Sequence, residues 1–356
     1  MYLRTHVAGF GCVLASAVLT FAGYADDGAR VVPTSRAEDK EGPIFVVTEE
    51  NDLFTDEHTD RHYTQGLKLT YLAADDDVPR WVTQLSDDIP RLGLNITAQN
   101  WGYVFGQNMY TPTDLQTSTL IKNDRPYAGW LYGGAYLLRR GEAGDTGIPT
   151  EESFEADLGV TGPASLAGFF QTETHRYLVY SEDPRGWHNQ IAGEPGLLLK
   201  YERFWRLSPS DEAARYVDFI PHVGGEVGNI MVFQNLGATL RAGVNLPDDF
   251  GVQIIDSPAS AGGGITSRSQ AFSFYAFAGA DGRAVEHNIF LDGASFRGGP
   301  SVERNPWVAD LSCGAAMRLF RHFELSYTRV ARTTEFVGQQ KYDLFGSIEA
   351  KAMFLF

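Results

Sequence analysis

The chain has 356 residues, and its 29 Lys and Arg against 45 Asp and Glu give a formal net charge of −16. Such an acidic balance lacks the basic face that nucleic-acid binding requires, so a nucleic-acid partner is excluded. The 38 glycines and an aromatic content of 13% are typical of many short strands joined by turns.

Residues 1–25 have the composition of a cleavable signal peptide. A weakly positive start, MYLR with His6, precedes the apolar run VAGFGCVLASAVLTFAG, and small residues ending at Ala25 suit a signal peptidase. The run is short and no positive cluster follows it, which argues against a membrane anchor. We therefore expect export and a mature domain of residues 26–356.

The cysteines and the apolar runs limit how the mature chain can be built. Cys12 would leave with the signal peptide, and Cys313 would remain alone, so no disulfide can form within the mature chain. No other segment reaches the roughly 18 apolar residues that a membrane-spanning helix needs. If the mature chain lies in a membrane, it must therefore do so as a closed β-barrel.

Alternation of apolar and polar residues recurs along the mature chain and predicts β-strands. In the segment ESFEADLGV, Phe154, Ala156 and Leu158 share one face, whereas Glu155 and Asp157 share the other. Twelve strands are predicted, at residues 44–50, 66–73, 101–108, 128–139, 152–161, 196–206, 214–226, 233–245, 271–283, 306–319, 322–332 and 342–356.

A soluble sandwich also shows such alternation, so the pattern leaves two architectures open. Three features favour an all-β, 12-stranded antiparallel transmembrane barrel: charges in the middle of strands, an apolar face that mixes small residues with aromatics, and a final strand that ends on Phe356 in register with that face. The even strand number agrees with this architecture. Between the second and third strands, VPRWVTQLSDDIPRL is predicted to be helical. The segment HNIFLDG is ambiguous.

The chemically rich segments fall in three predicted loops. With both ends of the mature chain in the periplasm, the loops after odd-numbered strands face outward, namely 51–65, 109–127 and 162–195. The first contains ENDLF and TDRHYTQG, the second KNDRPYAGW, and the third GPASLAGFFQTETHRYLVYSEDPRGWHNQ. A helix is expected after Pro163, in which Gln171 and His175, four residues apart, would share one face.

Together these motifs resemble the outer-membrane lipid A 3′-O-deacylase family, in the same order and over most of the mature chain. The resemblance implies a barrel that removes the 3′ acyloxyacyl chain of lipid A with the help of a divalent cation, usually calcium. It implies functional roles for Asn51 and Asp52 of END, Thr64 of HYTQG, His175 of QTETH and Glu182 of YSEDPRGW.

Candidate ligands and substrate contacts are drawn from the same loops. Asp52 and Glu182 could supply anionic oxygen to calcium, with Asn51 or Thr64 adding neutral oxygen. The candidate substrate-binding residues are Gln171, Lys122 and Arg125.

The residues themselves are compatible with ester hydrolysis. An ester needs an activated water and stabilisation of the developing oxyanion. With an ordinary pKa of about 6.5, His175 is suited to act as a general base near neutral pH. Calcium could polarise the carbonyl as a Lewis acid.

Other polar residues of the first loop have simpler interpretations. His58 and His62 are more easily read as solvated or structural than as catalytic. A solvent-exposed loop is the simplest interpretation of Asp56, Glu57 and Asp60. These acids could also bind the cations that bridge lipopolysaccharide molecules. No GxSxG motif is present in the sequence.

Two further functions remain open from the sequence. One is a barrel that binds ligands or forms a pore without catalysis; the other is a phospholipase-type barrel with Ser181, near His175, as nucleophile. If the chain is a lipid A deacylase, the expected partner is lipid A or lipopolysaccharide in the outer membrane. Loop residues such as Arg61, Arg176 and Arg185 are expected to contact its phosphates. A monomer is expected.

Overall fold

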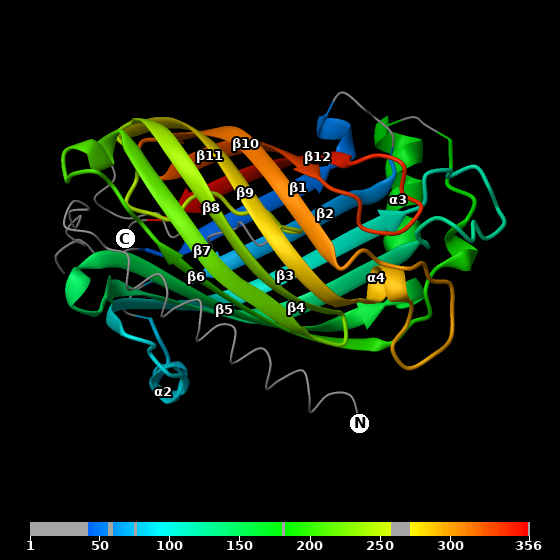
Figure 1. The fold of residues 1–356 in the computed structure, drawn as a ribbon, viewed down its shortest axis with the longest axis horizontal. Coiled ribbons are helices and arrows are strands. Elements are labelled where there is room, and N and C mark those ends of the chain that lie inside the picture. The colour runs from blue at the N-terminus through cyan, green and yellow to red at the C-terminus, as the bar shows by residue number, and fades with distance from the viewer. Residues whose placement is uncertain (1–41, 56–59, 75–76, 180–181, 258–270, 355–356) are drawn as a thin grey trace.

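The described part of the chain forms one closed barrel. The computed structural model describes residues 42–55, 60–74, 77–179, 182–257 and 271–354. The strands follow one another around the barrel in sequence order, and β1 closes it by pairing with both β2 and β12 (Figure 1). The residues expected to form the signal peptide lie outside the described residues, as do Asp56, Glu57, His58, Ser181 and Phe356.

All twelve predicted strands are present, and every neighbouring pair is antiparallel. Their bounds are β1 Ile44–Asn51, β2 His62–Leu72, β3 Leu94–Thr111, β4 Ala128–Ala143, β5 Ile148–Thr161, β6 Pro195–Trp205, β7 Val217–Gly228, β8 Met231–Val244, β9 Phe272–Asn288, β10 Trp307–Leu319, β11 Phe323–Arg332 and β12 Asp343–Met353. The predicted 12-stranded transmembrane barrel is therefore confirmed.

The helices are short and lie in the connections. The predicted helix between the second and third strands is α2 Arg80–Asp88, and the ambiguous HNIFLDG contains α4 Ile289–Asp292. The third loop forms α3 Ala167–Thr174 and then a π-helical turn. The single turns are η1 Asp52–Phe54, η2 Gly144–Thr146, η3 Gly162–Ser165, η4 His175–Val179, η5 Trp187–Asn189 and η6 Ala213–Arg215. Among these described helices, none is long and apolar enough to cross a membrane.

Side chains alternate between an exposed outer face and a buried lumen. In β5, Leu158 is 67% exposed, whereas its neighbour Asp157 is fully buried. Buried charges are tolerated where they are paired. Lys200 Nζ lies 2.7 Å from a Glu155 carboxylate oxygen and 2.9 Å from Asp157, and Lys68 lies 2.6 Å from the other Glu155 oxygen. The expected polar lumen is thus filled with ion pairs.

The connection after β8 folds back into this lumen. Within residues 246–257, the backbone N–H of Gln253 donates to Glu349 over 3.0 Å, and that of Ile255 donates to Glu50 over 2.7 Å. Because Glu349 belongs to β12 and Glu50 to β1, the segment is fastened to the inside of the wall. It occupies the space through which a pore would have to pass.

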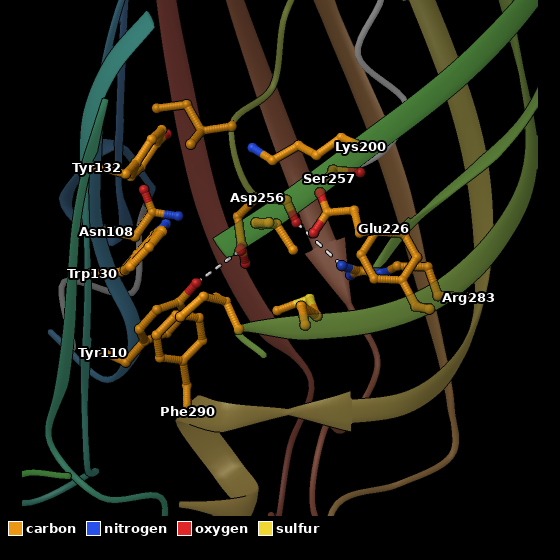
Figure 2. Close-up of a pocket in the computed structure, with 15 residues that line it drawn as sticks. Asn108, Tyr110, Trp130, Tyr132, Lys200, Glu226, Asp256, Ser257, Arg283 and Phe290 are labelled. Carbon is orange, nitrogen blue, oxygen red and sulfur yellow. Dashed lines mark hydrogen bonds between the residues drawn. The ribbon is translucent and has the colours of Figure 1, made fainter. Parts of the chain in front are cut away.

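The cavity beside this segment is small. Figure 2 shows Tyr110 donating to the Asp256 carboxylate over 2.9 Å and Arg283 donating to the Asp256 carbonyl over 3.3 Å. The cavity around them measures about 40 Å³, which is room for a few water molecules. This filling of the lumen argues against the pore alternative.

The three motif-rich loops emerge at one end of the barrel. Since the strands alternate in direction, the connections after β1, β3 and β5 leave the wall at the end that carries α3 (Figure 1). The helix α2, which connects β2 to β3, lies toward the opposite end. The convergence of these loops, expected from the sequence, is therefore confirmed.

Candidate active site

Strands β1 and β2 place polar side chains on the outer face of the barrel wall. In β1, Glu50 points into the lumen, where the Tyr63 hydroxyl donates to it over 2.8 Å. Its neighbours Glu49 and Asn51 therefore lie on the outer face, because successive strand residues alternate. There Gln65 donates to Glu49 over 2.7 Å. The polar surface at this end faces outward, away from the lumen.

A bulge directs Thr64 to the same outer face. Tyr63 pairs with Tyr110 of β3, but the next pairing in the register involves Gln65, so Thr64 is the extra residue of a β-bulge. Its hydroxyl lies 2.7 Å from that of Thr111, which follows the lumen-facing Tyr110 and so points outward. The bulge thus places the predicted Thr64 in a buried outer position, 3% exposed.

The turn after β1 brings two aspartates together. Asn51 caps the turn η1, because its side-chain oxygen accepts the backbone N–H of Leu53 over 2.8 Å. The next side chain, Asp52, accepts the backbone N–H of Arg61 over 3.0 Å. This hydrogen bond folds the chain so that Asp52 and Asp60 interact electrostatically.

His175 connects the third loop to Asp60. Its Nε2 lies 2.6 Å from an Asp60 carboxylate oxygen, and its Nδ1 lies 2.7 Å from the backbone carbonyl of Glu182. Both partners are acceptors, so the arrangement suits an imidazolium that donates from both nitrogens. The hydrogen bond to Asp60 raises the pKa of His175 above its ordinary value, although burial opposes the shift.

Gln171 contacts the same carboxylate as His175. Its side-chain nitrogen donates to Asp60 over 3.1 Å, while its oxygen accepts the indole N–H of Trp187 over 2.7 Å. The predicted shared face of Gln171 and His175 is therefore confirmed. This face of the helix is directed at Asp60, which from the sequence was expected to lie in a solvated loop.

The helix α3 packs against the outside of the barrel wall. Ala167 and Trp187 form an apolar cluster with Met109, which points outward from β3. On β4, Gly129 permits the close approach of Ser165, since a Cβ atom there would collide with that side chain. The candidate site consequently lies in a seam between the wall and α3.

Asp52 has the features of a cation ligand. It is 2% exposed, and its Oδ1 has no hydrogen-bond partner among the residues that the structure describes. Burial, and then the charge of Asp60, raise the pKa of Asp52 to about 8. Two crowded carboxylates of this kind fit a hard cation such as calcium, which prefers oxygen. No three His, Cys, Asp or Glu side chains are grouped as metal ligands among the described residues.

The other predicted residues lie in different positions. The carboxylate of Glu182 is exposed, and only its backbone carbonyl reaches His175. Lys122 is exposed. Arg125 is fully buried, donates to Glu335 over 3.0 Å and lies over the lumen-facing Tyr110 ring. The structure therefore does not bring Arg125 to the Asp60–His175 pair, and its binding role stays a prediction.

His62 is structural, which was one of its two expected readings. It is 4% exposed, its Nδ1 lies 2.7 Å from Asp343, and its Nε2 lies 3.5 Å from Asp124. The residues that sequence reasoning missed are Asp60, Thr111 and Trp187. The only signal for Asp60 was its place in the same motif as Thr64.

The pKa of His175 tests the pair with Asp60 directly. In calcium-free protein we expect the pKa of His175 to exceed about 6.5, since the Asp60 charge favours the imidazolium. The Asp60→Asn variant should lower it, because the neutral amide no longer stabilises the charged form. Titration of labelled histidines by NMR in micelles measures this. Asp183→Asn is the control and should have a smaller effect; an unchanged pKa in Asp60→Asn would refute the pair.

Comparisons with known proteins give a family and a fold. The family model described as outer membrane protein LpxR matches residues 12–354. The solved structure of LpxR from Salmonella typhimurium is similar, with a TM-score of 0.68 and 21% sequence identity over 87% of this chain and 100% of that one. At this identity the structural likeness supports the barrel fold only.

Other comparisons are weaker. The β-domain of the Bordetella autotransporter BrkA covers 90% of this chain at 11% identity, with a TM-score of 0.40 over 100% of its own length. None of the curated protein sequences is similar enough to give a match.

Proposed function

Because this chain belongs to the family of the outer membrane protein LpxR, we propose that it is a calcium-dependent carboxylic ester hydrolase that removes the 3′-linked acyloxyacyl chain from lipid A. The observation that carries the proposal is the 2.6 Å contact between His175 Nε2 and Asp60, beside the buried Asp52. This contact brings the imidazole of His175, from the third loop, next to the carboxylate oxygens of the first loop.

The location of the seam suits a substrate held in a membrane. Lipid A is anchored by its acyl chains, so an enzyme must reach its ester from the side. The pair of Asp60 and His175 lies on the outer face of the wall, covered by α3, rather than in the lumen. With the α3 end facing the cell exterior, the ester of a lipid A molecule in the outer leaflet can enter this seam laterally.

His175 is the proposed general base. When the contact with Asp60 is weakened, Nε2 gives up its proton to solvent and His175 becomes a neutral imidazole with its remaining proton on Nδ1. Nε2 then takes a proton from water as the water oxygen bonds to the ester carbonyl carbon. When the carbon–oxygen bond to the sugar breaks, the imidazolium returns that proton to the sugar oxygen. The products are a free acyloxyacyl fatty acid and a sugar hydroxyl. The hydrogen bond from Nδ1 to the Glu182 carbonyl keeps the ring oriented throughout.

The remaining residues position the carboxylates of Asp52 and Asp60. Calcium held by Asp52 and Asp60 would neutralise them, weaken the hold of Asp60 on His175 and polarise the ester carbonyl. Gln171, fixed by the indole of Trp187, holds Asp60 in place. Asn51 shapes the turn that presents Asp52. Lys122, which is exposed, remains a candidate for a lipid A phosphate.

Mass spectrometry of lipid A tests the proposal. Purified lipopolysaccharide is incubated with the folded protein in detergent, with calcium or with excess chelator. We expect the mass of one 3′ acyloxyacyl unit to be lost with calcium only, because the crowded Asp52 and Asp60 carboxylates need a cation. Calcium restored after chelation should recover the activity.

The same assay distinguishes the alternatives. A phospholipid substrate in parallel micelles reports phospholipase activity, and its hydrolysis with lipid A unchanged would favour that alternative. If neither lipid is altered by the folded barrel, the hydrolase proposal is wrong. Loss of an acyl chain from another position would correct the substrate position alone.

A further inference from the structure

A row of charged side chains crosses the outer wall at the end opposite α3. Arg139 of β4, Glu152 of β5 and Arg203 of β6 are register partners across three adjacent strands. Glu152 lies on the outer face, since it alternates with the lumen-facing Ser153 and Glu155 along β5. All three residues of the row are nevertheless buried.

The row is covered by the C-terminal end of α2 and the residues that follow it. Arg139 donates to the backbone carbonyls of Ser86 and Pro90 over 3.0 and 3.1 Å. Arg203 donates to the carbonyl of Leu92 over 3.0 Å. Ser86 lies in the last turn of α2, where carbonyls lack a helical N–H partner, and Arg139 supplies the missing donor. The helix is thereby clamped to the outside of the barrel.

Within the row the charges are compensated. Arg139 Nη2 lies 2.6 Å from Glu152, and Arg203 lies 3.2 Å from the same carboxylate. The hydroxyl of Tyr201 also donates to Glu152, over 2.8 Å. Charged groups on the lipid face of a barrel are costly unless they lie near the interface or are covered. Because Arg139, Glu152 and Arg203 are paired with one another and covered by α2, their position is compatible with the boundary between lipid and water.

The helix presents an apolar edge next to its wall contact. Val82 and Ser86 are buried against the barrel. Trp81 and Leu85, four residues apart, are 56% and 49% exposed on the adjacent edge. The opposite edge, which contains Thr83, is polar. Such a division into apolar and polar edges is typical of helices that lie at a membrane surface.

The apolar edge continues into the lipid-facing surface of β3. Trp81 packs edge-on against Trp101, with ring centres 6.0 Å apart, and Trp101 packs against Tyr103 with centres 5.0 Å apart. Tyr103 is 53% exposed, as is Phe105 farther along the same outer face. Indoles and phenols prefer the boundary between headgroups and acyl chains.

We propose that α2 is an interfacial helix that rests on the phospholipid surface of the leaflet at this end of the barrel. Trp81 and Leu85 insert at the boundary between headgroups and acyl chains, and the edge with Thr83 stays in water. The clamp by Arg139 and Arg203 holds the helix at this depth. In the orientation proposed above, this is the periplasmic leaflet. The inference depends on the barrel fold and is independent of ester hydrolysis.

Spin labels on the two edges of α2 test the inference. In a Cys313→Ser background, single cysteines replace Leu85 or Thr83, and the labelled barrels are reconstituted into phosphatidylcholine–phosphatidylglycerol vesicles. We expect the label at 85 to collide more with oxygen and less with a water-soluble nickel chelate. The label at 83 should show the reverse. Heat-modifiable gel migration confirms that each variant is folded.

A second measurement leaves the helix native. Phosphatidylcholine brominated near the headgroup should quench the fluorescence that Trp81 contributes, defined as the difference between wild type and Trp81→Phe. Equal nickel-chelate access at 83 and 85, together with no bromine quenching of Trp81, would overturn the proposal. Protection of position 85 in detergent-free vesicles only upon addition of another protein would also overturn it, in favour of a protein partner.

Discussion

Replacement of His175 by alanine is expected to slow the release of the acyloxyacyl chain by about 10²–10⁴-fold, the usual contribution of a general acid–base group. The variant removes the only imidazole that contacts Asp60 in the described structure. The base that activates water and the acid that protonates the leaving oxygen would both be lost. Initial rates with purified barrel, calcium and lipid A micelles measure the effect.

His188→Ala is the matched control. His188 lies in the same loop and is exposed, and its Nε2 contacts the side chain of Asn189 over 3.2 Å. Its removal should leave the rate within about twofold of wild type, since exposed substitutions away from a site have small effects. A His175→Ala barrel that is folded and retains the wild-type rate would remove His175 from the mechanism.

The barrel could be predicted from the sequence because its strands face lipid on one side and a polar lumen on the other, which makes apolar and polar residues alternate. Lipid outside and polar lumen inside fix the pattern of strands such as β5. Prediction fell short where a strand extends past the membrane. The third strand was expected at 101–108, yet β3 begins at Leu94. In the added part Asn95 and Thr97 are exposed polar residues, and a bulge between Ile96 and Ala98 shifts the register. There the alternation of apolar residues is lost.

The site was only partly predictable. The loops and the residues Asn51, Asp52, Gln171 and His175 were found through motifs. The role of Asp60 depends on a contact with a residue 115 positions later, 175 − 60, and several acids of that loop have the same local character. The neighbouring sequence therefore does not show that Asp60, rather than another acid of this loop, faces α3.

The folding of the segment after β8 into the lumen was not predicted, for a related reason. The stretch LPDDFGVQIIDS, residues 246–257, has the composition of a turn between strands. Its Asp249 is buried and its Asp256 is half-buried, and arginines of the wall meet both inside the barrel. That pairing joins parts of the chain that are distant in sequence, so it becomes visible only in the folded structure.

The Arg332→Met variant is expected to destabilise the barrel by about 3 kcal/mol, because breaking a buried ion pair leaves uncompensated charge. Arg332 donates to Asp310 over 2.9 Å and to the Asp256 carbonyl over 2.6 Å, and it is 1% exposed. Methionine keeps much of the side-chain volume but removes the charge. Arg283, which lies 3.0 Å from Asp310, limits the loss.

Urea unfolding of the reconstituted barrel, followed by heat-modifiable migration, measures this change as a lower midpoint at unchanged slope. Arg297→Met is the control, because Arg297 is exposed, and its midpoint should match wild type. Since Arg332 also fastens the lumen segment through Asp256, ion conductance across planar bilayers should rise in Arg332→Met alone. Equal stability of the two variants would show that the Arg332 pairs do not hold the lumen segment.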